Sequence, residues 1–224
     1  MALTHYRPRR GQPPFIPLEF SGAAYRFGHS QVRQDYILNA ALHPLPIFAP
    51  GAGRGTDLSG FKPLLNGWSV DWAVFFGPTA QRGRLIDTQL PASLTALPQT
   101  VHGGSSLTEA NLLRGAAYRL PSGQAVAAAL GLTPLTDDEL ALPDAGPAPL
   151  WFYVLREAAV QQAGLRLGAV GSVLVGEVLL GLLDRDKLGY QRQAPKWTPA
   201  VEPHWAGASV TTFGELLGYA GPGQ

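Results

Sequence analysis

The stretch PLEFSGAAYRFGHSQVRQDYIL, residues 17–38, carries the pattern on which the fold prediction depends. Pro17 suits the first turn of a helix. The apolar residues that follow at roughly helical spacing are Phe20, Ala24, Phe27 and Val32. We therefore predict a helix over residues 18–38. His29 lies on it with Arg26 one turn before, and it is the only one of the five histidines that we place in a helix.

Helix-start signals recur after residue 105. Ser106 and Glu109 have the spacing of a capping box, and Pro149 suits the start of an amphipathic helix. The predicted helices cover residues 106–118, 122–130, a very short piece from 136, 149–162, 167–184 and a short piece from 212. The charges at 137–139 are typical of a helix start rather than of paired catalytic carboxylates.

The longest apolar stretch runs from Leu167 to Leu183 and carries Glu177 near its centre. It is shorter than the roughly 20 residues that cross a bilayer, so we interpret it as a buried core helix. Residues 39–105 and 190–209 show no sustained periodicity and are predicted to be irregular. The sequence thus predicts a mainly α fold with long coil segments, as one domain over residues 1–224. Residues 1–16 form an extended, basic, Pro-rich lead-in.

The composition limits the possible functions. Hydrophobic residues make up 46% of the chain and charged residues only 15%, whereas about a quarter of a soluble domain is usually charged. Either much of the surface is buried against a partner, or the protein encloses a large apolar ligand. A net charge of +1 gives no reason to expect nucleic acid or an acidic membrane as partner. The absence of cysteine excludes thiolate sites and disulfides. With no apolar signal segment at the N-terminus we expect a cytoplasmic protein, while secretion by another route stays open.

Two interpretations of His29 follow from the residues alone. A helical histidine with a cation one turn away can ligate a haem iron while the cation meets a propionate, but a lone helical histidine is more often structural. The other histidines have no His-x-x-x-His spacing, which argues against a zinc hydrolase. The glycines of residues 51–55 lack the Lys-Ser/Thr of a phosphate loop. The basic run Arg7–Arg10 is interpreted as a solvated or partner-docking tail.

A family resemblance favours the first interpretation. PFIPLEFSGAAYRFGHS, residues 14–30, resembles the proximal-histidine helix of animal-type haem peroxidases, the peroxidase–cyclooxygenase superfamily, and is most similar to its bacterial members. NLLRG, residues 111–115, resembles the downstream helix of that family, and LPSGQ, residues 120–124, continues the likeness. The stretches that resemble its C-terminal region are residues 149–158, 167–171 and 176–183. The resemblance implies a helical haem-peroxidase-like domain corresponding to the C-terminal, proximal half of the family's domain.

The resemblance assigns roles to four residues. It implies that His29 is the proximal ligand of a haem b iron, with the haem not covalently attached. Asn111 would accept a hydrogen bond from the other ring N–H of His29 and so fix its tautomer. Arg26 lies three residues before His29 and Arg114 three after Asn111, so both are expected to meet haem propionates, which suit bidentate pairing with arginine.

The sequence departs from the family in two places. The family's distal histidine, catalytic arginine and distal acidic residues precede the proximal helix, whereas only about 20 residues precede Ser21 here. Residues 115–119, GAAYR, also replace an Arg-Asp-His-Gly-like continuation. Distal catalytic residues therefore stay unassigned. We expect exposed apolar surface, and hence a homo-oligomer or a partner chain that completes the distal side. The sequence is either a natural short protein or a piece of a longer one.

The activity implied by the resemblance is peroxide-dependent oxidation of a small organic donor or a halide. Peroxide cleavage needs a distal base and cation, which a partner or an unconventional arrangement would have to supply. The alternatives are a non-enzymatic haem-binding or interaction subunit, a fatty-acid oxygenase of the cyclooxygenase type, and a purely structural helical protein. We expect no nucleic-acid partner and no membrane span.

Overall fold

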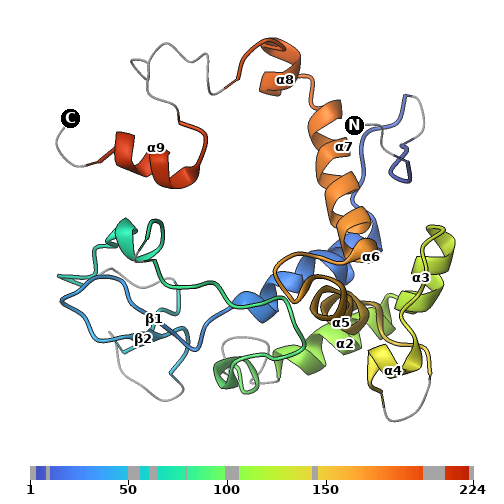
Figure 1. Cartoon of the computed structure of the whole chain (residues 1–224), viewed down its shortest axis with the longest axis horizontal. Helices are drawn as coiled ribbons and strands as arrows, with labels where there is room; N and C mark the ends of the chain where they lie inside the picture. The colour runs from blue at the N-terminus through green and yellow to red at the C-terminus, as the bar shows by residue number, and fades with distance from the viewer. Residues whose placement is uncertain are drawn as a thin grey trace.

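The described part of the chain is mainly helical, as the sequence predicts. The computed structural model describes residues 4–8, 11–49, 56–60, 65–78, 80–98, 106–142, 146–198 and 210–221 (Figure 1). Among these residues the only strands are β1 (Asp35–Tyr36) and β2 (Leu45–Pro46), which pair antiparallel. Apart from β2, the described residues between 39 and 98 hold only the 3₁₀ turns η2 (Trp72–Val74) and η3 (Ala92–Leu94), so the coil prediction is confirmed for them. The glycines of residues 51–55 lie outside the described residues.

The first predicted helix is shorter than expected. The α-helix α1 (Leu18–Gly22) is followed by a break at Ala23 and by the 3₁₀ helix η1 (Ala24–Gln31). The prediction of helix as far as residue 38 is wrong because the following backbone is bonded elsewhere. The N–H of Arg33 donates to the hydroxyl of Tyr36, and the N–H and C=O of Ile37 both bond the side-chain amide of Gln81.

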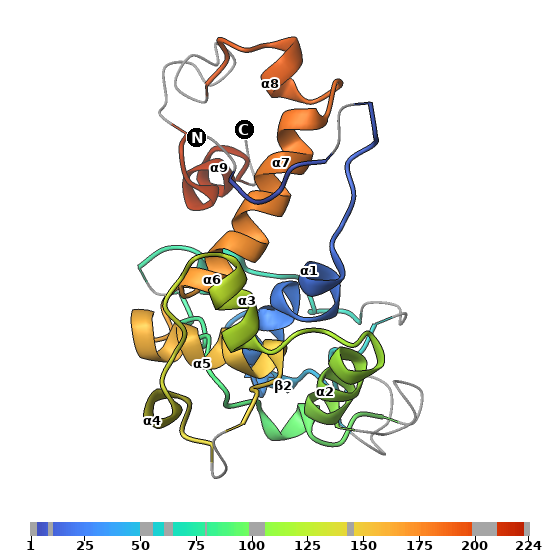
Figure 2. The ribbon, with the colours of Figure 1, turned by 90° about the vertical axis from the view of Figure 1, so that its right-hand side faces the viewer.

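The centre of the core is the helix α5 (Leu150–Gln162), which begins after Pro149 as predicted. It contacts η1, α2 (Leu107–Ala117), α3 (Gly123–Ala129), α4 (Asp137–Leu140) and α6 (Ala169–Ser172). The residues of α5 that are buried are Leu150, Trp151, Tyr153, Val154, Leu155, Glu157 and Ala158. Because they surround the helix instead of forming one stripe, α5 packs against neighbours on several sides (Figure 2).

A second long helical run leaves this core. It consists of α6, the π-helical turn η5 (Val173–Glu177) and α7 (Val178–Arg185), and α7 projects away from α5 in Figures 1 and 2. The prediction of a buried helix holds for α6, whose Val170 and Gly171 are buried, but α7 is buried only at Val178 and Gly181. Leu179, Leu180 and Leu183 are 40–48% exposed. None of the described helices is long and apolar enough to cross a membrane.

The lead-in is docked on this second run. The Glu177 carboxylate accepts hydrogen bonds from the backbone N–H groups of Thr4, His5 and Tyr6, at 3.1, 2.6 and 2.8 Å. Burial raises the pKa of this carboxyl, but the three bonds together with the charge of His5 outweigh it, so the pKa lies below its usual value. The described lead-in residues are non-helical, as expected. Of the basic run, Arg7 is exposed, while Arg9 and Arg10 lie outside the described residues.

Two further helices, α8 (Tyr190–Gln193) and α9 (Phe213–Tyr219), follow α7. The predicted start at residue 212 is confirmed, because Thr212 and Glu215 form a complete capping box. The tail predicted to be irregular contains the single turn of α8, whose sequence carries no start signal that we recognised.

Close packing at Gly123 gives a stability test. A Cβ at this position would lie 1.9 Å from Cγ of Tyr153, a fully buried ring whose hydroxyl accepts from the N–H of Leu135. We expect Gly123→Ala to lower the free energy of unfolding by about 3 kcal/mol, measured by urea denaturation. Gly115→Ala is the matched control, since a Cβ at Gly115 meets open space. It should stabilise the helix by about 0.5–1 kcal/mol. Equal effects of the two substitutions would contradict this packing.

Glu157 gives a second test. Its buried carboxylate accepts from the N–H groups of Val170 and Gly171 at 3.1 and 3.2 Å, and so caps the start of α6. Removing it in Glu157→Ala leaves both donors buried without that partner, at an expected cost of about 2–5 kcal/mol. The exposed control Glu109→Ala should change stability by no more than about 0.5 kcal/mol.

The pH dependence of stability tests the same carboxyl. Burial raises the pKa of Glu157 more than its two backbone hydrogen bonds lower it. A carboxyl with a raised pKa contributes stability that is complete below the pKa of the unfolded chain and is lost as the pH rises through the folded value. We expect Glu157→Gln to remove the part of the decline in unfolding free energy with rising pH that this carboxyl causes. An unchanged profile would show that Glu157 is not the group responsible.

Candidate functional site

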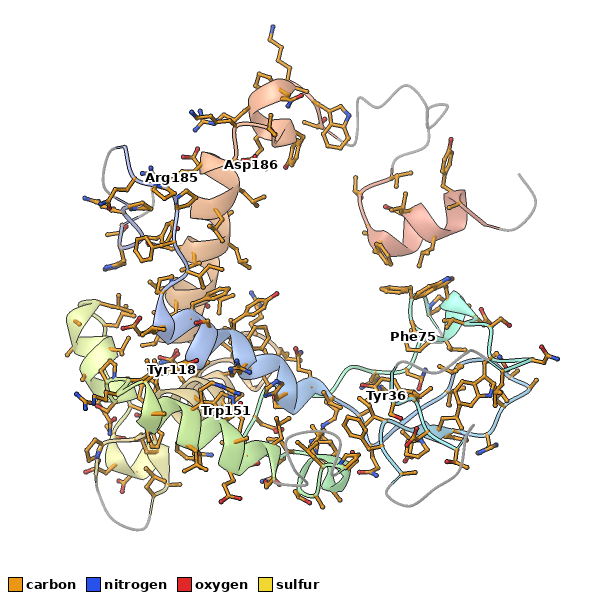
Figure 3. The ribbon with its side chains drawn as sticks, turned by 180° about the vertical axis from the view of Figure 1, so that it is seen from behind. Tyr36, Phe75, Tyr118, Trp151, Arg185 and Asp186 are labelled. Carbon is orange, nitrogen blue, oxygen red and sulfur yellow. The ribbon has the colours of Figure 1, made fainter. Side chains whose placement is uncertain are left out.

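The helices α1–η1 and α2 lie side by side and run in opposite directions (Figure 3). At one end a Cβ on Gly22 would lie 2.9 Å from Cδ2 of Tyr118, so the absence of a side chain allows the Tyr118 ring to approach the backbone. At the other end His29 contacts Asn111. Two segments about 80 residues apart in the sequence thereby meet at two places, at one of which His29 and Asn111 are partners.

The contact between His29 and Asn111 is the one that the resemblance implies. Nδ2 of Asn111 lies 2.9 Å from Nδ1 of His29. Asn111 is fully buried, and its carbonyl oxygen Oδ1 has no hydrogen-bond partner among the described atoms. A half-turn of the amide would place Oδ1 at Nδ1, where it accepts from the Nδ1–H of the imidazole. That tautomer makes Nε2 the metal-binding nitrogen, so the residues present fit an axial histidine.

Local helix geometry places Arg26 beside His29. In a 3₁₀ helix the side chains three positions apart eclipse each other, about 6 Å apart along the axis. Arg26 is held at two points: its Nε donates to the carbonyl of Ser21 at 2.9 Å, and its own carbonyl accepts from the indole N–H of Trp151 at 3.2 Å. Trp151 is buried on α5, so the core helix fixes the position of the arginine. Sequence reasoning missed Trp151, although it falls in a stretch of family resemblance.

Arg26 and Arg114 form a pair of like charges. Burial lowers the pKa of the Arg26 guanidinium, and the neighbouring Arg114 cation lowers it further, against a smaller opposing effect of Tyr118. Both side chains are half-buried. Within the described residues neither has a carboxylate at ion-pair distance, and the ion pair there joins Arg192 to Asp184. Two neighbouring cations with no carboxylate at ion-pair distance in the described part of the chain form a local centre suited to an anion.

Arg84 supports the far end of η1. Its Nε donates to the carbonyl of Ser30 at 3.1 Å, and its Nη2 donates to the carbonyl of Gln89. A cation at a helix C-terminus is favourable, and here it ties the coil of residues 80–98 to the histidine helix. No signal in the sequence marked this arginine, because its partners are backbone atoms.

Arg26, His29 and Arg114 are half-buried, whereas Asn111 is fully buried. Figure 3 shows the ribbons of α1–η1 and α2 that carry them. Three hollows of the surface lie elsewhere. They are lined by the lead-in and the end of α7, by residues 69–76 and α9, and by residues 112–122 with 147–150. His29, Arg26 and Arg114 line none of these three.

No second chemical centre accompanies His29 in the described residues. They contain no group of three or more metal-ligating side chains. A single axial histidine does not form such a group, so this absence does not bear on haem ligation. The backbone N–H of His5 donates to Glu177, and His43 is exposed. His102 and His204 lie outside the described residues. Residues 115–119 form the end of α2 and a turn in which Arg119 has a φ of +52°. A distal base therefore stays unassigned.

Comparison of the sequence with models of known protein families gives no match, and a search among curated proteins finds no relative.

The like-charge pair can be tested in the protein without ligand. Arg114→Gln removes one of two neighbouring cations, so we expect the free energy of unfolding to stay equal or to rise by a few tenths of a kcal/mol. Arg26→Gln is the comparison: it relieves the same repulsion but loses the bond to Ser21, worth about 1 kcal/mol. Thermal unfolding at low salt measures both. A clear loss of stability in Arg114→Gln would mean that this arginine has a structural partner.

Proposed function

We propose that this protein binds haem b through Nε2 of His29 and acts as a peroxidase-like oxidoreductase. The observation that carries the proposal is the convergence of four side chains from two helices. His29 contacts Asn111, and on the same helix pair Arg26 and Arg114 form a cationic pair. One imidazole and two guanidiniums match the iron and the two carboxylates of a haem.

Each residue has a defined part in holding the group. Asn111, with its amide turned so that Oδ1 accepts from Nδ1–H, would orient the ring of His29 and raise its basicity. Arg26 and Arg114 would neutralise propionates, which fixes the rotation of the porphyrin in its plane. When bound, the haem supplies the redox chemistry that oxidises a small donor or halide with hydrogen peroxide.

The second candidate is a haem-binding subunit without catalytic activity. It is favoured by one observation on the sequence: the stretch in which the resembled family carries its distal histidine and arginine has no counterpart among the roughly 20 residues before Ser21. Peroxide cleavage needs both. The two candidates differ in peroxide-dependent oxidation of a generic aromatic donor by the haem-loaded protein, compared with free haem at the same concentration.

Haem binding can be measured directly. Apoprotein titrated with ferric haem should develop a shifted, saturable Soret band, and His29→Ala should lose it or bind on the order of tenfold more weakly because the axial ligand is absent. His43→Ala is the matched control, since His43 is exposed and lies outside the site. A Soret band of the same position and intensity in His29→Ala would overturn the assignment of His29.

A further inference from the structure

A hollow with a volume of about 850 Å³ lies between the lead-in and the end of α7, and we call it the lead-in hollow. Its lining consists of residues 11–14 of the lead-in together with Asp184, Arg185, Lys187 and Arg192. Figure 3 shows Arg185 at the end of α7, next to the lead-in. The volume falls within the range of about 300 to 1,000 Å³ that is typical of pockets for small molecules.

The wall that the lead-in contributes is held in place by hydrogen bonds. Ahead of it in the sequence, the Glu177 carboxylate accepts from three successive backbone N–H groups at 3.1, 2.6 and 2.8 Å. The side chain of Tyr6 is buried, and its hydroxyl donates to the carbonyl of Phe15 at 2.6 Å and accepts from the N–H of Phe15 at 3.0 Å. Because Tyr6 and Phe15 flank residues 11–14, their contact closes the segment into a loop and fixes this wall beside α7.

Two of the three cations that line the hollow are oriented by backbone carbonyls. Nη2 of Arg185 donates to the carbonyl of Pro8 at 3.1 Å. Nε and Nη2 of Arg192 donate to the carbonyl of Asp184 at 3.0 and 2.6 Å, and Nη2 also donates to the carboxylate of Asp184 at 3.1 Å. A guanidinium has five N–H donors in a planar fork, so each arginine keeps further donors for a ligand.

Positive charge exceeds negative charge in this lining. Asp184 is the only carboxylate among the described residues that line the hollow, and it is already paired with Arg192. The carboxylate of the neighbouring Asp186 accepts from the N–H of Leu188. Arg185 and Lys187 thus have no carboxylate at ion-pair distance in the described part of the chain. Two such cations beside a guanidinium held in place favour an anionic ligand.

We propose that the lead-in hollow binds a small anion that carries two linked phosphates, as in pyrophosphate. Arg185 ends α7, Lys187 lies in the turn that follows and Arg192 lies on α8, so the cations come from three positions of the chain. A carboxylate offers two oxygens in one plane, whereas linked phosphates offer oxygens in several directions. A guanidinium fork pairs with two of these oxygens, and an ammonium serves as a point charge.

This site is independent of haem binding at His29. None of the residues Arg26, His29, Asn111 and Arg114 lines the lead-in hollow. Since residues 11–14 form one wall and α7 with α8 carries the cations, the ligand would contact both segments. Binding should therefore stabilise the docked position of the lead-in.

Calorimetric titration of the full chain with sodium pyrophosphate, at low salt and without divalent cations, tests the site. We expect saturable binding of one pyrophosphate per chain. Lys187→Gln should weaken it about tenfold, because one charged donor is lost. Lys196→Gln is the matched control, since Lys196 is also exposed but does not line the hollow, and it should bind as the unchanged protein does. Absence of binding, or equal affinity in the two variants, would overturn the proposal.

Two further titrations identify the class and the place of the anion. Malonate, which has two linked carboxylates and fewer oxygens, should bind about tenfold more weakly than pyrophosphate. Equal affinity for malonate would overturn the assignment to phosphate. Arg114→Gln should bind pyrophosphate with unchanged affinity. A loss of binding in that variant would place the anion at the Arg26–Arg114 pair and overturn the assignment to the hollow.

Hydrogen exchange tests the part that the lead-in plays. If binding requires the docked lead-in, pyrophosphate at about ten times its dissociation constant should slow exchange of the amides of residues 4–6 about tenfold. The amides of Thr211 and Thr212 are the matched control, because a carboxylate, that of Glu215, also holds them, and neither residue lines the hollow. Their exchange should not change. Unchanged exchange at residues 4–6 would show that the lead-in is not a wall of the site and would overturn the proposed site.

Discussion

The structure depends on the hydrogen bonds that the buried helix α5 makes to the backbone of its neighbours. The indole of Trp151 donates to the carbonyl of Arg26, and the hydroxyl of Tyr153 accepts from the N–H of Leu135. Farther along, the carboxylate of Glu157 accepts from the first turn of α6. The bonds of Tyr153 and Glu157 are buried and that of Trp151 is partly buried, so losing them would leave polar groups unpaired in or beside the core. One helix thus fixes three distant segments, one of which carries the site.

The consequence for the site is that η1 has little freedom to move. Its backbone is bonded to α5 at Arg26 and to Arg84 at Ser30, so both ends of the turn that carries His29 are held. This matters because η1 is a 3₁₀ helix, a form with poorer hydrogen-bond geometry that seldom extends over eight residues without support. The external bonds offset that weakness, and the eclipsed side chains of the 3₁₀ form align Arg26 with His29. A regular α-helix would separate them by about 60° around the axis.

Much of this could be predicted where the determining interaction is local in sequence. The starts at Thr136 and Thr212 were predictable because the capping residue and its glutamate are three positions apart, and the structure shows both capping boxes complete. The helix start after Ser106 was also predictable, although its side chain makes no capping bond. The end of η1 was not, since it depends on Gln81 bonding Ile37 across 44 residues. The exposure of α7 was missed because a hydrophobic sequence alone does not show which face finds a neighbour.

The same distinction separates the two levels of the site. Arg26 and His29 are three residues apart on one helix, and Asn111 and Arg114 are three apart on another, so each pair could be predicted from the sequence. No local pattern, however, brings the two pairs together. Their approach requires the antiparallel course of α1–η1 and α2, for which a glycine at position 22 leaves room beneath Tyr118. The approach has an electrostatic cost, since it places one guanidinium near another. An interaction that disfavours the folded state and is nevertheless built by well-bonded helices is more readily explained by a ligand than by stability. The like-charge pair therefore favours a dianionic group at these helices over a structural role for the four residues.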